Sequence, residues 1–148
     1  MATLKWLILC ERAVVEQQTG SLSMVALVEN IAMPSPPPEL AEKGQIAVPF
    51  RFYAVQHWAR SELNEEEQPQ ARMLMIGPNG KDLAHNEYLV DLRLHPKANV
   101  IGQSMGFPLV GEGAYKCRVQ VKTGSKWRTL GESEFRVTYV RPPLTPPH

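Results

Sequence analysis

The amino-acid sequence predicts an all-β protein: a single-domain antiparallel β-sandwich. Three observations predict this class. Apolar and polar residues alternate in several short runs, turn-forming residues separate these runs, and no segment has the pattern of a helix longer than about two turns. Short alternating runs at regular spacing are typical of sandwiches and barrels, and we expect about seven to nine strands.

The length and charge of the chain fit one domain. It has 148 residues, with 16 Lys and Arg against 15 Asp and Glu. A chain of this length can bury enough surface to form one core. We expect the sandwich over residues 1–140 and a proline-rich extended tail over residues 141–148. Because nucleic-acid binders usually carry a basic excess, the balanced charge argues against a nucleic-acid partner.

The first expected strands are Leu4–Cys10 and Ser21–Ile31. Between them, Ala13–Gln17 is either a strand extension or a helical turn. A short helix is expected around Pro38–Lys43, because a proline run precedes it and proline favours the first helical turn. Apolar residues then recur at every second position from Ile46 to Ala54, which predicts one long strand. Pro49 lies inside this strand and places it at a sheet edge or a bulge, because proline has no backbone donor.

Further strands are expected toward the C-terminus. Arg72–Ile76 is one, and Asn79-Gly80 after it is a strong hairpin signal. The next strand shows one apolar face, made of Tyr88, Val90, Leu92 and Leu94. Residues 100–110 contain two glycines and a proline and are read as an irregular strand or a loop. Residues 115–121 and 135–139 alternate most clearly, and a turn at residues 123–126 separates them.

The segment Gly113-Ala114-Tyr115-Lys116-Cys117 resembles the tyrosine corner of immunoglobulin-like domains, in which a tyrosine precedes a cysteine by two residues. This resemblance covers about the last third of the chain and implies a structural role for Tyr115 and Cys117, with the Tyr115 hydroxyl bonded to nearby backbone. The second cysteine of that family is missing, because Met24 and Ala26 stand where it is expected. We therefore expect Cys10 and Cys117 to be two buried thiols, with a disulfide between them as the alternative.

The whole chain is also similar to a family of small, uncharacterised bacterial proteins. The similarity is carried by Leu7-Ile8-Leu9-Cys10-Glu11, Val15-Glu16-Gln17, Gly20-Ser21-Leu22-Ser23-Met24-Val25 and the closing Gly113-Ala114-Tyr115. It implies a β-sandwich and transfers no catalytic residues to this chain.

No catalytic, cofactor-binding or metal-binding pattern is found in the sequence. The histidines at positions 57, 85, 95 and 148 do not have the spacing of metal ligands. Ser21, Ser23, Ser104 and Cys117 do not lie in a nucleophile elbow. We therefore expect a protein that is not an enzyme and has no cofactor.

Weak binding candidates are two neighbouring residues and one basic cluster. His57 and Trp58 could form a patch at a strand end, although Trp58 is also read as a core or rim residue. Positive charge gathers toward the expected C-terminal hairpin, at Lys116, Arg118, Lys122, Lys126 and Arg128. Glu132 and Glu134 on the adjoining strand are expected to neutralise much of it.

The leading hypothesis is a non-enzymatic protein-interaction or structural module in a bacterial cytoplasm, whose partner is another protein or a second copy. Its motivation is the exposed strand edges of a sandwich, together with proline-rich segments. The alternative is a small-ligand or carbohydrate-binding sandwich that uses Trp6, Trp58 and Trp127 as an aromatic platform. A third hypothesis is an enzyme whose site is assembled only in three dimensions. No membrane association is expected, because no apolar run is long enough to span a bilayer.

Overall fold

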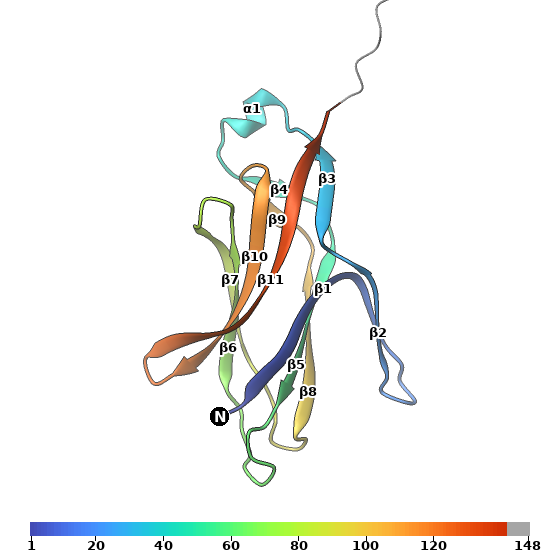
Figure 1. The fold of residues 1–148 in the computed structure, drawn as a ribbon, viewed down its shortest axis with the longest axis vertical. Coiled ribbons are helices and arrows are strands. Elements are labelled where there is room, and N and C mark those ends of the chain that lie inside the picture. Colours follow the sequence, from blue (N-terminus) through green and yellow to red (C-terminus); the bar gives the residue numbers. More distant parts are fainter. Residues whose placement is uncertain (142–148) are drawn as a thin grey trace, which may run out of the picture.

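The computed structural model describes residues 1–141, which form eleven strands and one short helix (Figure 1). In chain order the elements are β1 (Thr3–Val15), β2 (Leu22–Leu27), β3 (Asn30–Pro34), α1 (Pro38–Ala41), β4 (Ile46–Val48), β5 (Phe52–Ala59), β6 (Gln70–Ile76), β7 (Asp82–Leu89), β8 (Lys97–Ser104), β9 (Phe107–Leu109), β10 (Gly113–Thr123) and β11 (Lys126–Val140). The all-β sandwich predicted from the sequence is confirmed, with more strands than the seven to nine expected.

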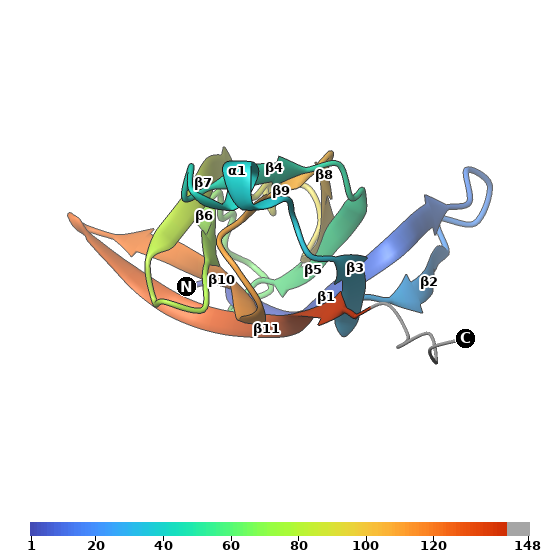
Figure 2. The same cartoon turned by 90° about the horizontal axis from the view of Figure 1, so that it is seen from above.

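The strands form two main sheets and one small sheet. A four-stranded sheet has the order β2-β1-β5-β8, and a five-stranded sheet has the order β3-β11-β10-β6-β7. The small sheet pairs β4 with β9. Seen from above, β1 and β11 lie along one side of the molecule, and β4, β9 and α1 lie along the opposite side (Figure 2). All described strand pairs are antiparallel except β3 with β11, which is parallel.

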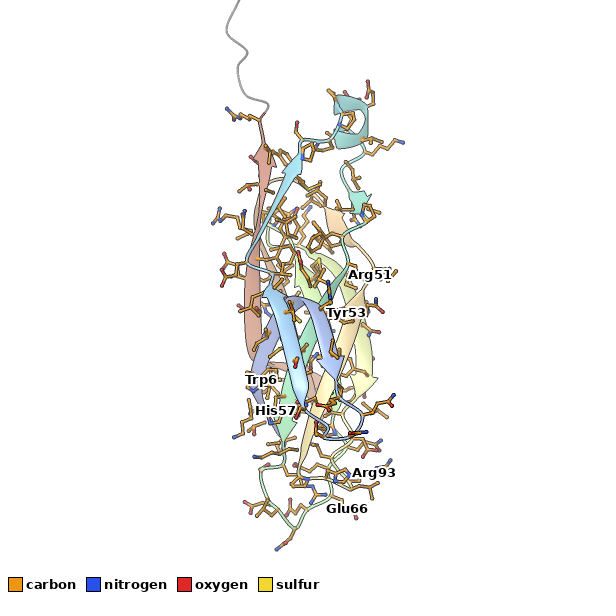
Figure 3. All side chains as sticks on the ribbon, turned by 90° about the vertical axis from the view of Figure 1, so that its right-hand side faces the viewer. Trp6, Arg51, Tyr53, His57, Glu66 and Arg93 are labelled. Atoms are coloured by element: carbon orange, nitrogen blue, oxygen red, sulfur yellow. The ribbon has the colours of Figure 1, made fainter. Side chains whose placement is uncertain are left out.

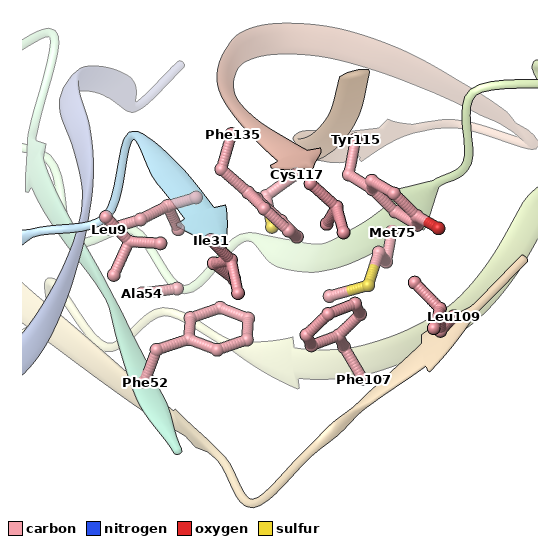
Figure 4. Packing of buried hydrophobic residues seen from close by; sticks show 12 residues of the cluster. Leu9, Ile31, Phe52, Ala54, Met75, Phe107, Leu109, Tyr115, Cys117 and Phe135 are labelled. Atoms are coloured by element: carbon pink, nitrogen blue, oxygen red, sulfur yellow. The ribbon is translucent and has the colours of Figure 1, made fainter. Parts of the chain in front are cut away.

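The larger of two core clusters is rich in aromatic rings (Figure 4). Tyr115 stacks on Phe135 with ring centroids 5.4 Å apart, and Phe107 meets both rings edge-on at 5.7 and 5.6 Å. Such contacts contribute ~0.5–1.5 kcal/mol per pair beyond the burial of the rings. Leu7 and Met73 pack against both clusters, so the interior is continuous between the two main sheets.

The smaller cluster surrounds Trp58 and contains a buried amide. Gln56 is 1% exposed, and its Oε1 accepts hydrogen bonds from Trp58 Nε1 at 2.9 Å and from the Tyr88 hydroxyl at 2.6 Å. Burial raises the pKa of Tyr88 to about 12, against a smaller lowering by the bond to Gln56. The amide therefore satisfies two polar groups that would otherwise lie unpaired in an apolar interior.

Two predicted strands are wrong, because each is divided between different sheets. The expected strand over residues 46–54 separates into β4 and β5, and Pro49 lies in the break. The expected strand over residues 21–31 separates into β2 and β3. Leu94, placed on an apolar strand face from the sequence, is 84% exposed in the loop after β7.

Other expectations are confirmed. α1 lies where the proline run predicts a helix, and residues 13–15 extend β1. The Asn79-Gly80 turn joins β6 to β7, with Gly80 at a φ of 80°. Gly124, with a φ of 64°, turns β10 into β11. Residues 100–110, read as irregular, provide the end of β8 and all of β9. Residues 142–148 of the predicted tail lie outside the described residues.

Candidate functional site

The outward side of the four-stranded sheet is built from rows of paired residues. Trp6 pairs with His57 and His57 with Asn99; Ile8 pairs with Val55 and Val55 with Ile101. Paired residues lie on the same side of a sheet, and neighbours in a strand point to opposite sides. Leu7 and Leu9 pack into the core, so these rows face outward. We call this surface the outer apolar face; its apolar and aromatic residues are Trp6, Ile8, Cys10, Val14, Val25, Leu27, Tyr53, Val55, His57 and Ile101. Cys10 and Val55 are fully buried within it. The polar residues Arg12, Ser23, Asn99 and Gln103 lie on the same side of the sheet.

Aromatic and polar side chains cross the outer apolar face from β1 to β8. The Trp6 and His57 rings stack with centroids 5.3 Å apart and planes at 14°, and both lie on the side that faces the viewer in Figure 3. Nδ1 of His57 lies 2.7 Å from Asn99 Oδ1. Because an amide oxygen only accepts hydrogen bonds, Nδ1 of His57 is the donor in this contact.

Beyond Cys10, β1 continues to Val15 and returns as β2. We call residues 11–28 the β1–β2 arm; this hairpin projects from the body of the sandwich in Figure 1. Its apolar side chains are exposed, at 53% for Val14, 47% for Val15, 51% for Val25 and 57% for Leu27. β2 pairs only with β1 and so forms one edge of the sheet. A free strand edge presents unpaired backbone donors and acceptors to any neighbouring chain.

A hollow adjoins the arm on the side of β3. Its volume is about 360 Å³, and apolar residues of the arm, β3 and the β4–β5 connection line much of it, among them Leu27, Val28, Ile31, Met33 and Phe50. Apolar surface therefore continues from the arm into a depression.

The outward side of the five-stranded sheet is charged. Arg118 Nε lies 2.5 Å from Glu132 Oε1, and Lys116 pairs with Glu134 on the next strand. Lys122 lies 5.9 Å from the centre of the Trp127 ring, and Arg72 lies 4.3 Å from it. Arg128 Nη2 lies 3.2 Å from the sulfur of Met1. Lys116, Arg118 and Lys122 thus lie on the outward side of β10, and Glu134, Glu132 and Trp127 are their register partners on β11.

Tyr115 and Cys117 lie in β10 and face the core. The Tyr115 hydroxyl donates to the Gly111 carbonyl at 2.7 Å and accepts from Val110 N–H at 3.0 Å, which ties the β9–β10 connection to β10. Burial raises the pKa of the Cys117 thiol to about 12. Cys10 and Cys117 are both buried and free, and they lie on different sheets.

The three tryptophans do not converge on one platform. Trp58 is fully buried, so its reading as a binding candidate is corrected to that of a core residue. Trp127 lies under Arg72 on the other sheet. Trp6 alone belongs to the outer apolar face, where it stacks on His57.

A second opening lies between the edges of β7 and β8. This cavity has a volume of about 300 Å³, with Phe52, Met73 and Met75 among its apolar lining and Asn86 and Ser104 among its polar lining. An adjoining cavity of about 440 Å³ shares Ala84, Gly106 and Pro108 with it. The space between the two main sheets is therefore open along the edges formed by β7 and β8.

Residues 1–141 contain no cluster of three or more His, Cys, Asp or Glu side chains arranged to hold a metal ion.

Comparisons with known proteins assign neither a family nor an activity to this chain. No protein-family model and no curated protein matches it, so neither the bacterial family nor an immunoglobulin-like assignment is confirmed. A glycosyl hydrolase family 2 member from Bacteroides cellulosilyticus DSM 14838 aligns with 62% of this chain at 14% identity and a TM-score of 0.44. The PmoD soluble domain from Methylocystis sp. ATCC 49242 (Rockwell) aligns with 93% of this chain and 98% of its own, at 10% identity and a TM-score of 0.36. This chain spans only 13% of the glycosyl hydrolase. Within residues 1–141, no helix is long and apolar enough to cross a membrane.

Sequence reasoning missed the outer apolar face, although a signal for it was present. Residues 6–10 are all apolar, and so are most of residues 52–59. A strand with one solvent-exposed side instead alternates apolar and polar residues. A continuous apolar run is typical of a strand that is covered on both sides. The structure shows that β1 and β5 are these strands and that only their inner side meets the other sheet.

Proposed function

We propose that this protein is a non-enzymatic interaction module that binds a polypeptide through the outer apolar face and the β1–β2 arm. The observation that carries the proposal is the apolar composition of both sides of β1 and β5. The inner side packs against the five-stranded sheet, while Trp6, Ile8 and Tyr53 on the outer side remain partly exposed. A second covering surface would complete the burial that this composition favours.

The chemistry of the face favours a protein partner. Large contiguous apolar surfaces on a folded protein mark interaction sites, and aromatic residues are enriched at the centre of interfaces. Tyr53, Trp6 and His57 supply aromatic rings, and the arm adds Val25 and Leu27. The free edge of β2 allows a partner strand to add backbone hydrogen bonds to the apolar contact.

The experiment is site-specific photo-crosslinking in cells of the source organism. A photoreactive amino acid replaces Val25 in the arm, and the matched control replaces Arg136, which is exposed on the charged outer side of β11. We expect the probe at position 25 to crosslink a discrete polypeptide that the probe at position 136 does not. The same crosslinking pattern from both positions, or none from either, would overturn the proposal.

A second candidate function is the binding of a small apolar ligand in the cavity between β7 and β8. Its volume of about 300 Å³ lies at the lower end of the range of small-molecule sites, and its mix of apolar and polar lining is typical of them. Gly102 is part of this lining, and a Cβ atom there would meet only the Ala54 carbonyl at 3.9 Å.

Gly102→Val is therefore expected to occupy part of the cavity without disturbing the fold. The measurement is the rise in melting temperature on adding members of a panel of alkyl glycosides and short fatty acids. A rise in the wild-type protein that Gly102→Val abolishes supports a ligand site. The absence of any shift in the wild-type protein contradicts it.

A further inference from the structure

The two main sheets end in four edge strands, and these edges differ in how they are protected. β7 carries Asp82 and Glu87, β8 begins at Lys97, and β3 ends at Pro34. Charges and prolines at sheet edges are the usual means by which proteins prevent pairing with another strand. β2 reads Leu-Ser-Met-Val-Ala-Leu and has neither a charge nor a proline. Among the described edge strands of the main sheets, β2 alone lacks both a charge and a proline. Its one irregular residue is Ala26, which has a φ of 58°.

The β1–β2 arm does not bury its own apolar residues. Beyond Cys10, β1 has only β2 beside it in the sheet, because its register with β5 runs from Thr3 to Cys10. A two-stranded ribbon is marginally stable in water unless another surface covers it. The exposure of Val14, Val25 and Leu27 shows that no part of residues 1–141 provides such a cover. The arm is therefore built to meet a surface outside the described residues.

We infer that this surface is the β2 strand of a second copy, so that two arms pair antiparallel about a two-fold axis near Val25. This inference rests on the proposed function and names its partner. The pairing joins two four-stranded sheets into one continuous eight-stranded sheet. A two-fold axis perpendicular to the sheet keeps both outer apolar faces on the same side, so Val25 and Leu27 of the two copies form one apolar strip.

The absence of charge in β2 is compatible with pairing to a second copy. The segment from Ser21 to Val28 is uncharged, so pairing with itself brings no like charges together. The first charged residue after β2 is Glu29. Glu29 lies beyond the end of β2, where the chain bends toward β3 in the other main sheet, so it is outside the segment that pairs. The arm projects from the body of the sandwich (Figure 1).

The test combines sedimentation equilibrium with a charge swap. The full-length wild-type protein is measured from micromolar to millimolar concentration and is expected to dimerise reversibly. Val25→Lys places two lysines opposite each other at the axis and is expected to raise the dimer dissociation constant by roughly tenfold or more. Leu94→Lys, the same charge change at a residue that is 84% exposed outside the arm, is the matched control and is expected to leave dimerisation unchanged.

Val25→Glu alone is also expected to be monomeric, and mixing it with Val25→Lys is expected to restore a heterodimer, which a merely unfolded variant could not do. A wild-type protein that stays monomeric, or a dimer that Val25→Lys does not weaken, overturns the inference. If the wild-type protein is monomeric but the probe at position 25 crosslinks a different polypeptide in cells, the inference fails and the proposed function stands. If the protein is monomeric and the probe crosslinks nothing beyond the control, both fail.

Discussion

The indole ring of Trp6 lies parallel to the imidazole ring of His57, with centroids 5.3 Å apart, across the neighbouring strands β1 and β5. The stack lies beside the place where the register of the two strands shifts, between Leu4 and Trp6. His57 is held from its other side by Asn99 on β8. The ring pair and the hydrogen bond to Asn99 together therefore connect three of the four strands of this sheet.

Trp6→Ala is expected to lower the free energy of unfolding by about 1–2 kcal/mol, because it removes the ring stack and part of the apolar burial over β5. Urea denaturation followed by circular dichroism measures this change. His57→Phe, which keeps a ring beneath Trp6, is the control and is expected to lose less. An unchanged midpoint for Trp6→Ala would show that the stack contributes nothing to the sheet.

The alternation of apolar and polar residues predicts strands that stay within one sheet. It does not predict where the chain passes from one sheet to another. Tyr115–Val121 alternates and has one partner strand on each side, so period two alone describes β10. Around Pro49 the pattern of apolar residues continues while the chain leaves one sheet for another, and periodicity cannot detect that change. Leu94 continues the apolar pattern of β7 into a loop, where nothing covers it.

The candidate site was less predictable than the fold, because it depends on which strands become neighbours. Trp6, His57 and Asn99 are far apart in the chain and meet only through the pairing of β1, β5 and β8. Trp58 follows His57 directly in the sequence, but its side chain points to the opposite side of the sheet, into the core. The unbroken apolar run at residues 6–10 indicates that both sides of a strand are apolar but does not show which side stays open.

Tyr115→Phe is expected to lower the free energy of unfolding by about 1–3 kcal/mol, since it leaves the Val110 N–H and the Gly111 carbonyl without the hydroxyl. Hydrogen exchange is expected to accelerate most at Val110, which loses its acceptor. The matched control is Tyr53→Phe, whose hydroxyl makes no hydrogen bond found within residues 1–141. Equal losses from the two variants would contradict a specific role for the Tyr115 hydroxyl.

Ala26→Gly is expected to stabilise the protein by about 0.5–1 kcal/mol. Ala26 has a φ of 58° in β2, and a Cβ atom in this left-handed region is unfavourable, whereas glycine adopts it at little cost. The greater freedom of glycine in the unfolded chain offsets part of the gain. Ala32→Gly in β3, where φ is not positive, is the control and is expected to destabilise. Thermal and urea unfolding compare the two, and a loss of stability in Ala26→Gly would contradict the prediction.

Alkaline pH is expected to destabilise the fold through Cys117. Burial raises the thiol pKa from 9.0 to about 12 in the folded protein, so the folded state retains the proton more strongly than the unfolded state does. The stabilisation from this difference is fully present below pH 9 and is lost as the pH rises from 9 toward 12. Cys117→Ala, compared with the wild-type protein by urea unfolding at pH 8 and pH 10, is expected to lose less stability over this interval.

The same burial predicts the reactivity of both thiols. Because the thiolate is the nucleophile, a buried thiol with a raised pKa reacts slowly. The pKa of Cys10 is also raised by burial, against a smaller lowering by a backbone hydrogen bond with Arg12. Titration with Ellman's reagent at pH 8 is expected to find slow reaction in the native protein and two thiols after denaturation without reductant, because both cysteines are free. Denatured protein that shows no thiol until a reductant is added would instead establish a Cys10–Cys117 disulfide and remove the basis of the alkaline effect.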